Sequence, residues 1–210
     1  MYHFYFNLPK NDKNAGTVFL PRKSSTGVPV IISCYGWNKI HWPIRVEEGL
    51  RDLAVGKRGM GMVTMALVGE SDDPSPAVCD RWERNLADMV AWVRDKRYFD
   101  AARVGLFAYG MPAKAALRLA DGDSGLAYVI INPAEPSEST PEETAIPVLT
   151  LHGTTDKIQI QSKPIKAEEV LRQGDAGSKT ASITFKGGDY HLYNIVEQAA
   201  VEIVKWIDGA

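Results

Sequence analysis

The chain has 210 residues, of which 45% are hydrophobic and 24% charged, and a formal net charge of -2. These values fit one globular domain, residues 1–210, that can bury a sizeable core. They offer no basic surface for nucleic acid or anionic membrane, and no apolar run approaches the ~18 residues of a membrane helix. Two cysteines, Cys34 and Cys79, are too few for a disulfide framework. We therefore expect a soluble cytoplasmic protein.

Strand-like and helix-like patterns alternate along the whole chain. In chain order, apolar runs and period-two alternation predict strands at 2–8, 17–20, 28–34, 61–68, 104–108, 127–131, 147–151 and 181–185. Helical spacing of apolar residues predicts helices around 46–54 and 82–93, and at 112–120, 164–173 and 192–207. The polar cluster 11–16 predicts the turn between the first two strands.

This alternation predicts an α/β fold. Strands separated by helices of ten or more residues indicate a mostly parallel central sheet, here of about eight strands, with helices on both faces. Ligands of such sheets bind beyond the carboxyl ends of the strands. The residues directly after each apolar run are therefore the candidates for a site.

The segment 103–117 predicts a buried strand, a sharp turn and a helix, in that order. This is the setting of the G-x-S-x-G nucleophile elbow, and 108–112 resembles it. The nucleophile position is taken by Gly110, which has no side chain and cannot attack a substrate. The segment thus resembles an elbow without its nucleophile.

Tyr35-Gly36-Trp37 follows the strand expected at 28–34. It resembles the H-G-x oxyanion loop of α/β-hydrolases, with Tyr35 in place of the usual histidine. By this resemblance, the backbone N–H groups of Trp37 and Met111 would bind the oxyanion. A simple glycine turn with an aromatic side chain packed on the core is the alternative.

Two further strand ends carry candidate catalytic side chains. His152-Gly-Thr-Thr-Asp156 resembles the H-G-x-x-D motif that supplies the triad acid, and His191 stands where the family places its catalytic histidine. Taken singly, Asp156 could be a helix cap and His191 an ordinary loop residue. Together with Gly110 they follow the family's order of nucleophile, acid and histidine.

The resemblance covers nearly the whole chain. On these residues the chain is identified as a member of the α/β-hydrolase superfamily. It is similar to small carboxylesterases of the feruloyl-esterase, cinnamoyl-esterase or dienelactone-hydrolase sort. The resemblance implies an α/β-hydrolase fold without a cap domain, because only 133–145 lies where larger relatives insert a lid. No spacing of His, Cys or Asp suggests a metal site and no glycine-rich motif suggests a nucleotide, so we expect no cofactor.

Other residues are poor replacements for the missing nucleophile. Ser33 and Cys34 end a strand beside the expected oxyanion segment, so Cys34 could lie near the site, but it would approach His191 from the wrong side. Tyr109 is next to Gly110, but an elbow turn would direct its side chain away.

Three functions remain open on the sequence. The chain could be a serine ester hydrolase whose nucleophile was replaced by Gly110, and therefore nearly inactive. It could be a natural binding protein without hydrolytic activity, or an enzyme that uses Asp156 and His191 as a general base without a covalent intermediate.

The expected ligand is a small-molecule ester or a related acyl compound. Aromatic residues in the loops around the site favour a planar or apolar acyl group, unless they belong to the core. They are Tyr35, Trp37, Trp42, Tyr109, Tyr190 and Tyr193. The oligomeric state cannot be read from the sequence.

Overall fold

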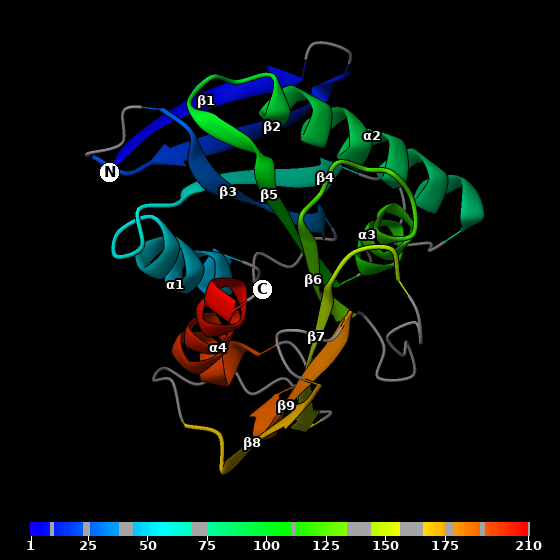
Figure 1. Cartoon of the computed structure of the whole chain (residues 1–210). Helices are drawn as coiled ribbons and strands as arrows, with labels where there is room; N and C mark the ends of the chain where they lie inside the picture. The colour runs from blue at the N-terminus through cyan, green and yellow to red at the C-terminus, as the bar shows by residue number, and fades with distance from the viewer. Residues whose placement is uncertain are drawn as a thin grey trace.

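A computed structural model of the chain describes ten stretches of it. They are residues 1–8, 11–22, 26–37, 44–68, 75–110, 112–133, 144–155, 166–174, 179–189 and 192–209. Within them a nine-stranded sheet runs through the molecule with helices on both faces (Figure 1). The expected fold class, a mostly parallel sheet between helices, is confirmed.

The described elements follow one another in the expected alternation. The strands are β1 Tyr2–Leu8, β2 Asn11–Leu20, β3 Val28–Trp37, β4 Gly61–Val68, β5 Phe99–Gly110, β6 Tyr128–Pro133, β7 Val148–Thr155, β8 Glu169–Gln173 and β9 Thr180–Asp189. The helices are α1 Ile44–Ala54, α2 Pro76–Arg94, α3 Ala113–Ala120, the 3-10 turn η1 Tyr193–Ile195 and α4 Val196–Gly209. No described helix is both long and apolar enough to cross a membrane.

The strand order across the sheet is β1-β2-β4-β3-β5-β6-β7-β9-β8. The strands from β4 to β9 in this order pair in parallel, whereas β1, β2 and β8 pair antiparallel with their neighbours. The carboxyl ends of β3, β5, β6, β7 and β9 therefore meet at one edge of the sheet. This is the edge where the sequence predicts the site.

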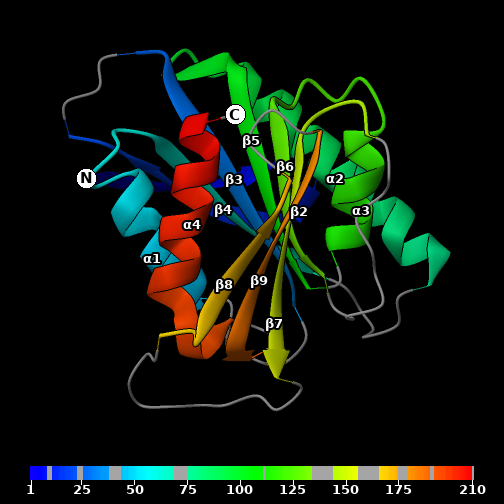
Figure 2. The ribbon, with the colours of Figure 1, turned by 60° about the horizontal axis from the view of Figure 1, so that its bottom comes forward.

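Two hydrophobic cores lie on opposite faces of the sheet. Side chains alternate along β5, so that Leu106 and Ala108 join the core under α2 and α3. Phe107 and Tyr109 join the core under α1 and α4. Figure 2 shows α1 and α4 side by side on one face and α2 and α3 on the other.

The first strand pair differs from its prediction. We expected a turn over residues 11–16, but β2 already begins at Asn11 and pairs with β1, with an irregularity in register between Asn7 and Leu8. A strand neighbour explains Gly16, because a Cβ there would collide with the Phe6 ring and the Thr64 carbonyl. Pairing with β1, joined by pairing with β4 from Gly16 onwards, has therefore overridden the local turn signal.

The prediction of a helix over 164–173 is wrong for its described residues. Residues 169–173 form β8, which pairs antiparallel with β9 at the sheet edge. The sequence Glu-Glu-Val-Leu-Arg-Gln favours a helix locally, yet these residues extend the sheet and satisfy their backbone groups on β9. Tertiary pairing decides the conformation here.

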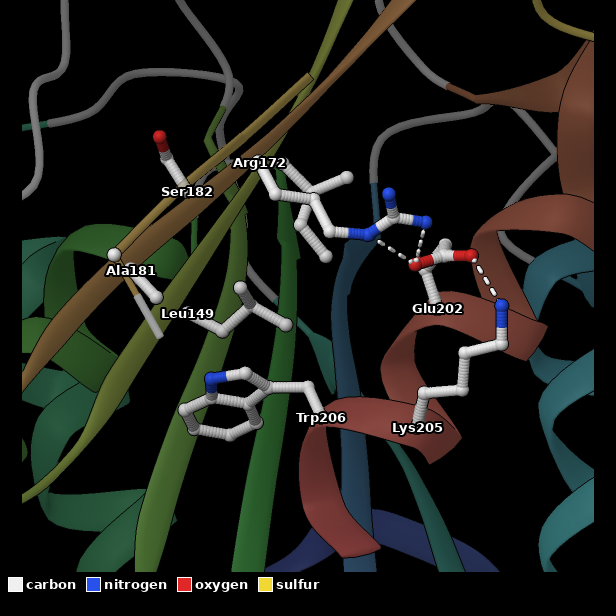
Figure 3. Close-up of a pocket in the computed structure, with 9 residues that line it drawn as sticks. Leu149, Arg172, Ala181, Ser182, Glu202, Lys205 and Trp206 are labelled. Atoms are coloured by element: carbon white, nitrogen blue, oxygen red, sulfur yellow. Dashed lines mark hydrogen bonds and ion pairs between the residues drawn. The ribbon is translucent and has the colours of Figure 1, made fainter. Parts of the chain in front are cut away.

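Arg172 attaches β8 to α4 (Figure 3). Its Nε and one terminal nitrogen donate to Glu202 Oε2 at 2.8 and 2.7 Å, and Lys205 Nζ donates to Oε1 at 2.9 Å. Burial of Glu202 acts to raise its pKa, but the hydrogen bonds from Lys205 and Arg172 outweigh burial and lower it. The buried carboxylate is thus compensated by two cations.

We expect Arg172→Gln to lower the free energy of unfolding by about 1–2 kcal/mol, because Glu202 loses one of its two cationic partners while it stays buried. Chemical denaturation measures the difference. Arg84→Gln, on the exposed face of α2, is the control and should stay within about 0.5 kcal/mol of the parent. If both substitutions lowered the free energy of unfolding equally, the Arg172–Glu202 ion pair would not stabilise this edge of the sheet.

Candidate active site

Gly110 ends β5 at the carboxyl edge of the sheet, and α3 begins three residues later. Its φ of +72° lies in the left-handed region, which residues with a Cβ disfavour. Apart from its chain neighbours, no described atom lies within 4 Å of the place where a Cβ would stand. The expected strand and helix are therefore present on either side of this position, and no described residue crowds the place of a Cβ on Gly110.

Two tyrosines lie beside Gly110. Tyr35 on β3 is the strand partner of Tyr109 on β5, so both point to the face covered by α1 and α4. Tyr109 is buried in that core, whereas Tyr35 keeps part of its surface exposed. Of the two, Tyr35 is the better placed to touch a ligand.

The expected oxyanion donors are described only in part. The β3 strand continues through Trp37, whose strand partner is Val68, so Tyr35-Gly36-Trp37 is the end of a strand and not a turn. The side chain of Trp37 and the whole of Met111 lie outside the described residues.

The described residues next to Asp156 and His191 lie opposite each other. Thr155 at the end of β7 is the strand partner of Asp189 at the end of β9. Thr154 Oγ1 accepts a hydrogen bond from the Gly187 N–H at 3.0 Å, and a Cβ on Gly153 would collide with the Asp189 carbonyl oxygen. Asp156, Tyr190 and His191 themselves lie outside the described residues.

The alternative nucleophiles are held in unreactive surroundings. Cys34 is fully buried, and burial together with the nearby Glu47 raises the pKa of its thiol. The Ser33 hydroxyl is also buried and donates to Glu47 Oε1 at 2.6 Å. These contacts agree with the expectation that neither residue replaces the missing nucleophile.

Glu47 is a half-buried acid that no sequence pattern pointed to. It lies in the first turn of α1, and burial raises its pKa to about 8 despite the hydrogen bond from Ser33. Burial, together with Glu47, also raises the pKa of Tyr35. Ser33 and Glu47 are fourteen residues apart in the chain, so no local sequence pattern predicts their hydrogen bond.

His152 is partly buried on β7, and burial lowers its pKa, which favours the neutral imidazole. Among the described residues, no three His, Cys, Asp or Glu side chains come together as they would around a metal ion.

A separate hollow of about 300 Å³ lies between β8, β9 and the end of α4 (Figure 3). Leu149 and Ala181, which line it, are near the amino ends of β7 and β9. It therefore lies at the edge of the sheet opposite Gly110 and is not part of the candidate site.

Comparison with known proteins identifies the fold. No family model and no curated protein matches the sequence. Est1E from Butyrivibrio proteoclasticus is similar in structure, with a TM-score of 0.63 at 12% identity over 99% of each chain. An alpha-beta serine hydrolase homologue from Coxiella burnetii has a TM-score of 0.62 at 16% identity, covering 97% of this chain and 96% of its own. Thermogutta terrifontis esterase 2, in a structure phosphorylated by paraoxon, has a TM-score of 0.64 at 13% identity, with 96% and 91% covered.

These neighbours are esterases and a serine hydrolase homologue, and they match nearly the whole of this chain. At such low identity the likeness establishes the fold alone. The chain has the α/β-hydrolase fold, and its size leaves little room for a cap domain.

Proposed function

We propose that the chain is a carboxylic ester hydrolase scaffold of the Ser-His-Asp type, in one domain, whose nucleophile position is occupied by Gly110. Asp156 and His191 are its acid and base, and the backbone N–H groups of Trp37 and Met111 are its oxyanion donors. The observation that carries the proposal is the backbone of Gly110. Its positive φ, at a strand end before a helix and with no described residue crowding the place of a Cβ, is what an elbow requires.

The ends of β7 and β9 support the acid and the base. Asp156 follows Thr155 in the chain, and His191 comes two residues after Asp189, the strand partner of Thr155. This supports the proposal, because the chain leaves β7 and β9 towards Asp156 and His191 from the same sheet edge as Gly110.

The chemistry that this arrangement lacks is one attacking atom. With a hydroxyl at position 110, His191 would take its proton as the oxygen bonds to the ester carbonyl carbon. The carbonyl oxygen would become the oxyanion, held by two N–H groups. His191 would then protonate the leaving alcohol, and water would release the acid in a second round.

We infer a small-molecule ester with a planar or apolar acyl group as the substrate class. Tyr35 supports this, because it is partly exposed beside the Tyr109–Gly110 strand end. Trp37, Tyr109 and Tyr190 are the other residues proposed to bind the substrate.

Covalent labelling tests the proposal. A dialkyl aryl phosphate should add one dialkylphosphoryl group to the Gly110→Ser variant, with loss of the aryl oxide, whereas the parent chain should stay unlabelled. Mass spectrometry of the intact protein measures the mass added. The double variant Gly110→Ser with His191→Ala should label far more slowly, because the hydroxyl loses its base.

Other outcomes favour the other functions. Labelling of the parent chain would reveal another attacking residue, and Cys34→Ala and Ser33→Ala would then identify it. A folded Gly110→Ser protein that never labels would favour a binding protein without hydrolytic activity, or a general-base enzyme.

A further inference from the structure

Asp189 and Asn194 form a closed pair of hydrogen bonds at the end of β9. The Asp189 N–H donates to Asn194 Oδ1 at 2.8 Å, and the Asn194 N–H donates to Asp189 Oδ2 at 2.9 Å. The Asn194 amide also donates to the Gly187 carbonyl at 3.1 Å. Both side chains are buried. This pair encloses the four residues 190–193, of which His191 is the second.

The same junction carries backbone strain. Leu192 is the one non-glycine residue with a positive φ in the described part of the chain, at 61°. Its side chain is fully buried in the core under α4, and its N–H donates to the Asp189 carbonyl at 2.9 Å. Such a conformation is strained and persists only where the surroundings impose it. Here the buried side chain and the Asp189–Asn194 pair impose it.

The pair is also connected to the strand that leads to Asp156. Asp189 is the strand partner of Thr155, and the Gly153 backbone lies too close to the Asp189 carbonyl for any Cβ. A buried carboxylate is expensive without full hydrogen bonding, and packing alone would be served by an apolar residue. A buried aspartate at position 189 therefore indicates that the geometry of its hydrogen bonds is important.

We propose that Asp189 and Asn194 are positioning residues that hold the loop of His191 in register with Asp156. This rests on the proposed function, because it assumes that His191 is the base of the site. Neither residue takes part in the chemistry. The pair sets the direction from which the imidazole meets its acid, which decides its tautomer.

The tautomer of His191 provides a test that requires no hydrolysis. In the parent chain at a pH near 8.5, the neutral imidazole should carry its proton on Nδ1 alone, bound to Asp156. Nitrogen NMR of ¹⁵N-histidine protein reads this, and His191→Gln assigns the signal among the four histidines. Asp189→Ala should convert the single tautomer into a mixture of two.

Two variants separate positioning from stability. Asp189→Asn keeps an oxygen that accepts the Asn194 N–H, so it should keep the single tautomer. Thr144→Ala removes another buried side-chain hydrogen bond, 2.7 Å long to the Ile146 carbonyl, at the opposite end of β7. It should lower the melting temperature without changing the tautomer. If Asp189→Ala does not fold, Asn194→Ala provides the same comparison.

A folded Asp189→Ala or Asn194→Ala protein that keeps the single tautomer overturns the positioning role, as does a mixture already present in the parent chain. Asp156→Asn in the same measurement reports on the triad separately. If it changes the tautomer while Asp189→Ala does not, only the positioning role falls. If Gly110→Ser is neither labelled nor active, the hydrolase proposal falls, whatever the tautomer shows.

Discussion

Gly110→Ser should raise the hydrolysis of p-nitrophenyl esters by at least ~10²–10³-fold over the parent chain, the scale of a restored nucleophile and base. On the proposed function, the parent would keep only what an oxyanion hole and binding supply, which is ~10³–10⁴-fold over water for a triad lacking one member. The space around Gly110 can receive the side chain, because no described atom crowds the position of its Cβ. Steady-state kinetics over several acyl lengths measure the gain.

The same substitution should lower stability by about 1–3 kcal/mol, because serine must adopt the left-handed φ of Gly110. Gly59→Ser is a matched control. Gly59 has a φ of +69° and equally open surroundings, but it lies between α1 and β4, away from the site. It should show the same loss in a thermal melt and no gain in activity.

Absence of activity in a folded Gly110→Ser protein would count against the parent esterase. The site around Gly110 would then serve binding and not the stabilisation of a tetrahedral intermediate. A turnover near 10 s⁻¹ in the parent chain itself, typical of a good enzyme, would instead show that another residue attacks.

The architecture could be predicted because it depends on patterns that many residues share. A continuous apolar run such as 61–68 can bury the side chains of both strand faces only between two helical layers. The strand β4 has the expected bounds. Residues 169–173 could not be predicted, because their pairing with β9 is a contact between segments that propensity ignores. Local sequence patterns therefore predict the structure correctly only where the long-range contacts agree with them.

The candidate site was predictable at the level of strand ends and not of supporting contacts. The position of Gly110 follows from the strand-turn-helix pattern around it. The bond from Ser33 to Glu47 joins a strand to a helix and has no local signature. The Asp189–Asn194 pair does have one, since two residues that cap backbone groups stand five apart between a strand and a helix.

Stability should fall as the pH rises from about 5 to about 8.5, through Glu47. Burial raises its pKa from 4.5 in the unfolded chain to about 8 in the folded one. Within this window the folded protein keeps the proton that the unfolded chain releases, so ionisation favours unfolding. Such a shift corresponds to roughly 4–5 kcal/mol at ~1.4 kcal/mol per pH unit. Because Glu47 is partly exposed and lies in the first turn of α1, where a negative charge is favoured, we expect about 2–3 kcal/mol.

Other groups titrate over the same range, so the informative quantity is the difference between variants. Glu47→Gln keeps an oxygen that accepts the Ser33 hydroxyl but cannot ionise. It should match the parent near pH 5 and exceed its free energy of unfolding by about 2–3 kcal/mol near pH 8.5. Glu48→Gln, an exposed neighbour on the same helix, removes only the smallest contribution to the raised pKa of Glu47, so most of the pH dependence of the parent should remain. Parallel curves for the parent and Glu47→Gln, measured by urea denaturation across this range, would show that Glu47 is already ionised in the folded protein, and that the α1 face of the site carries a charge.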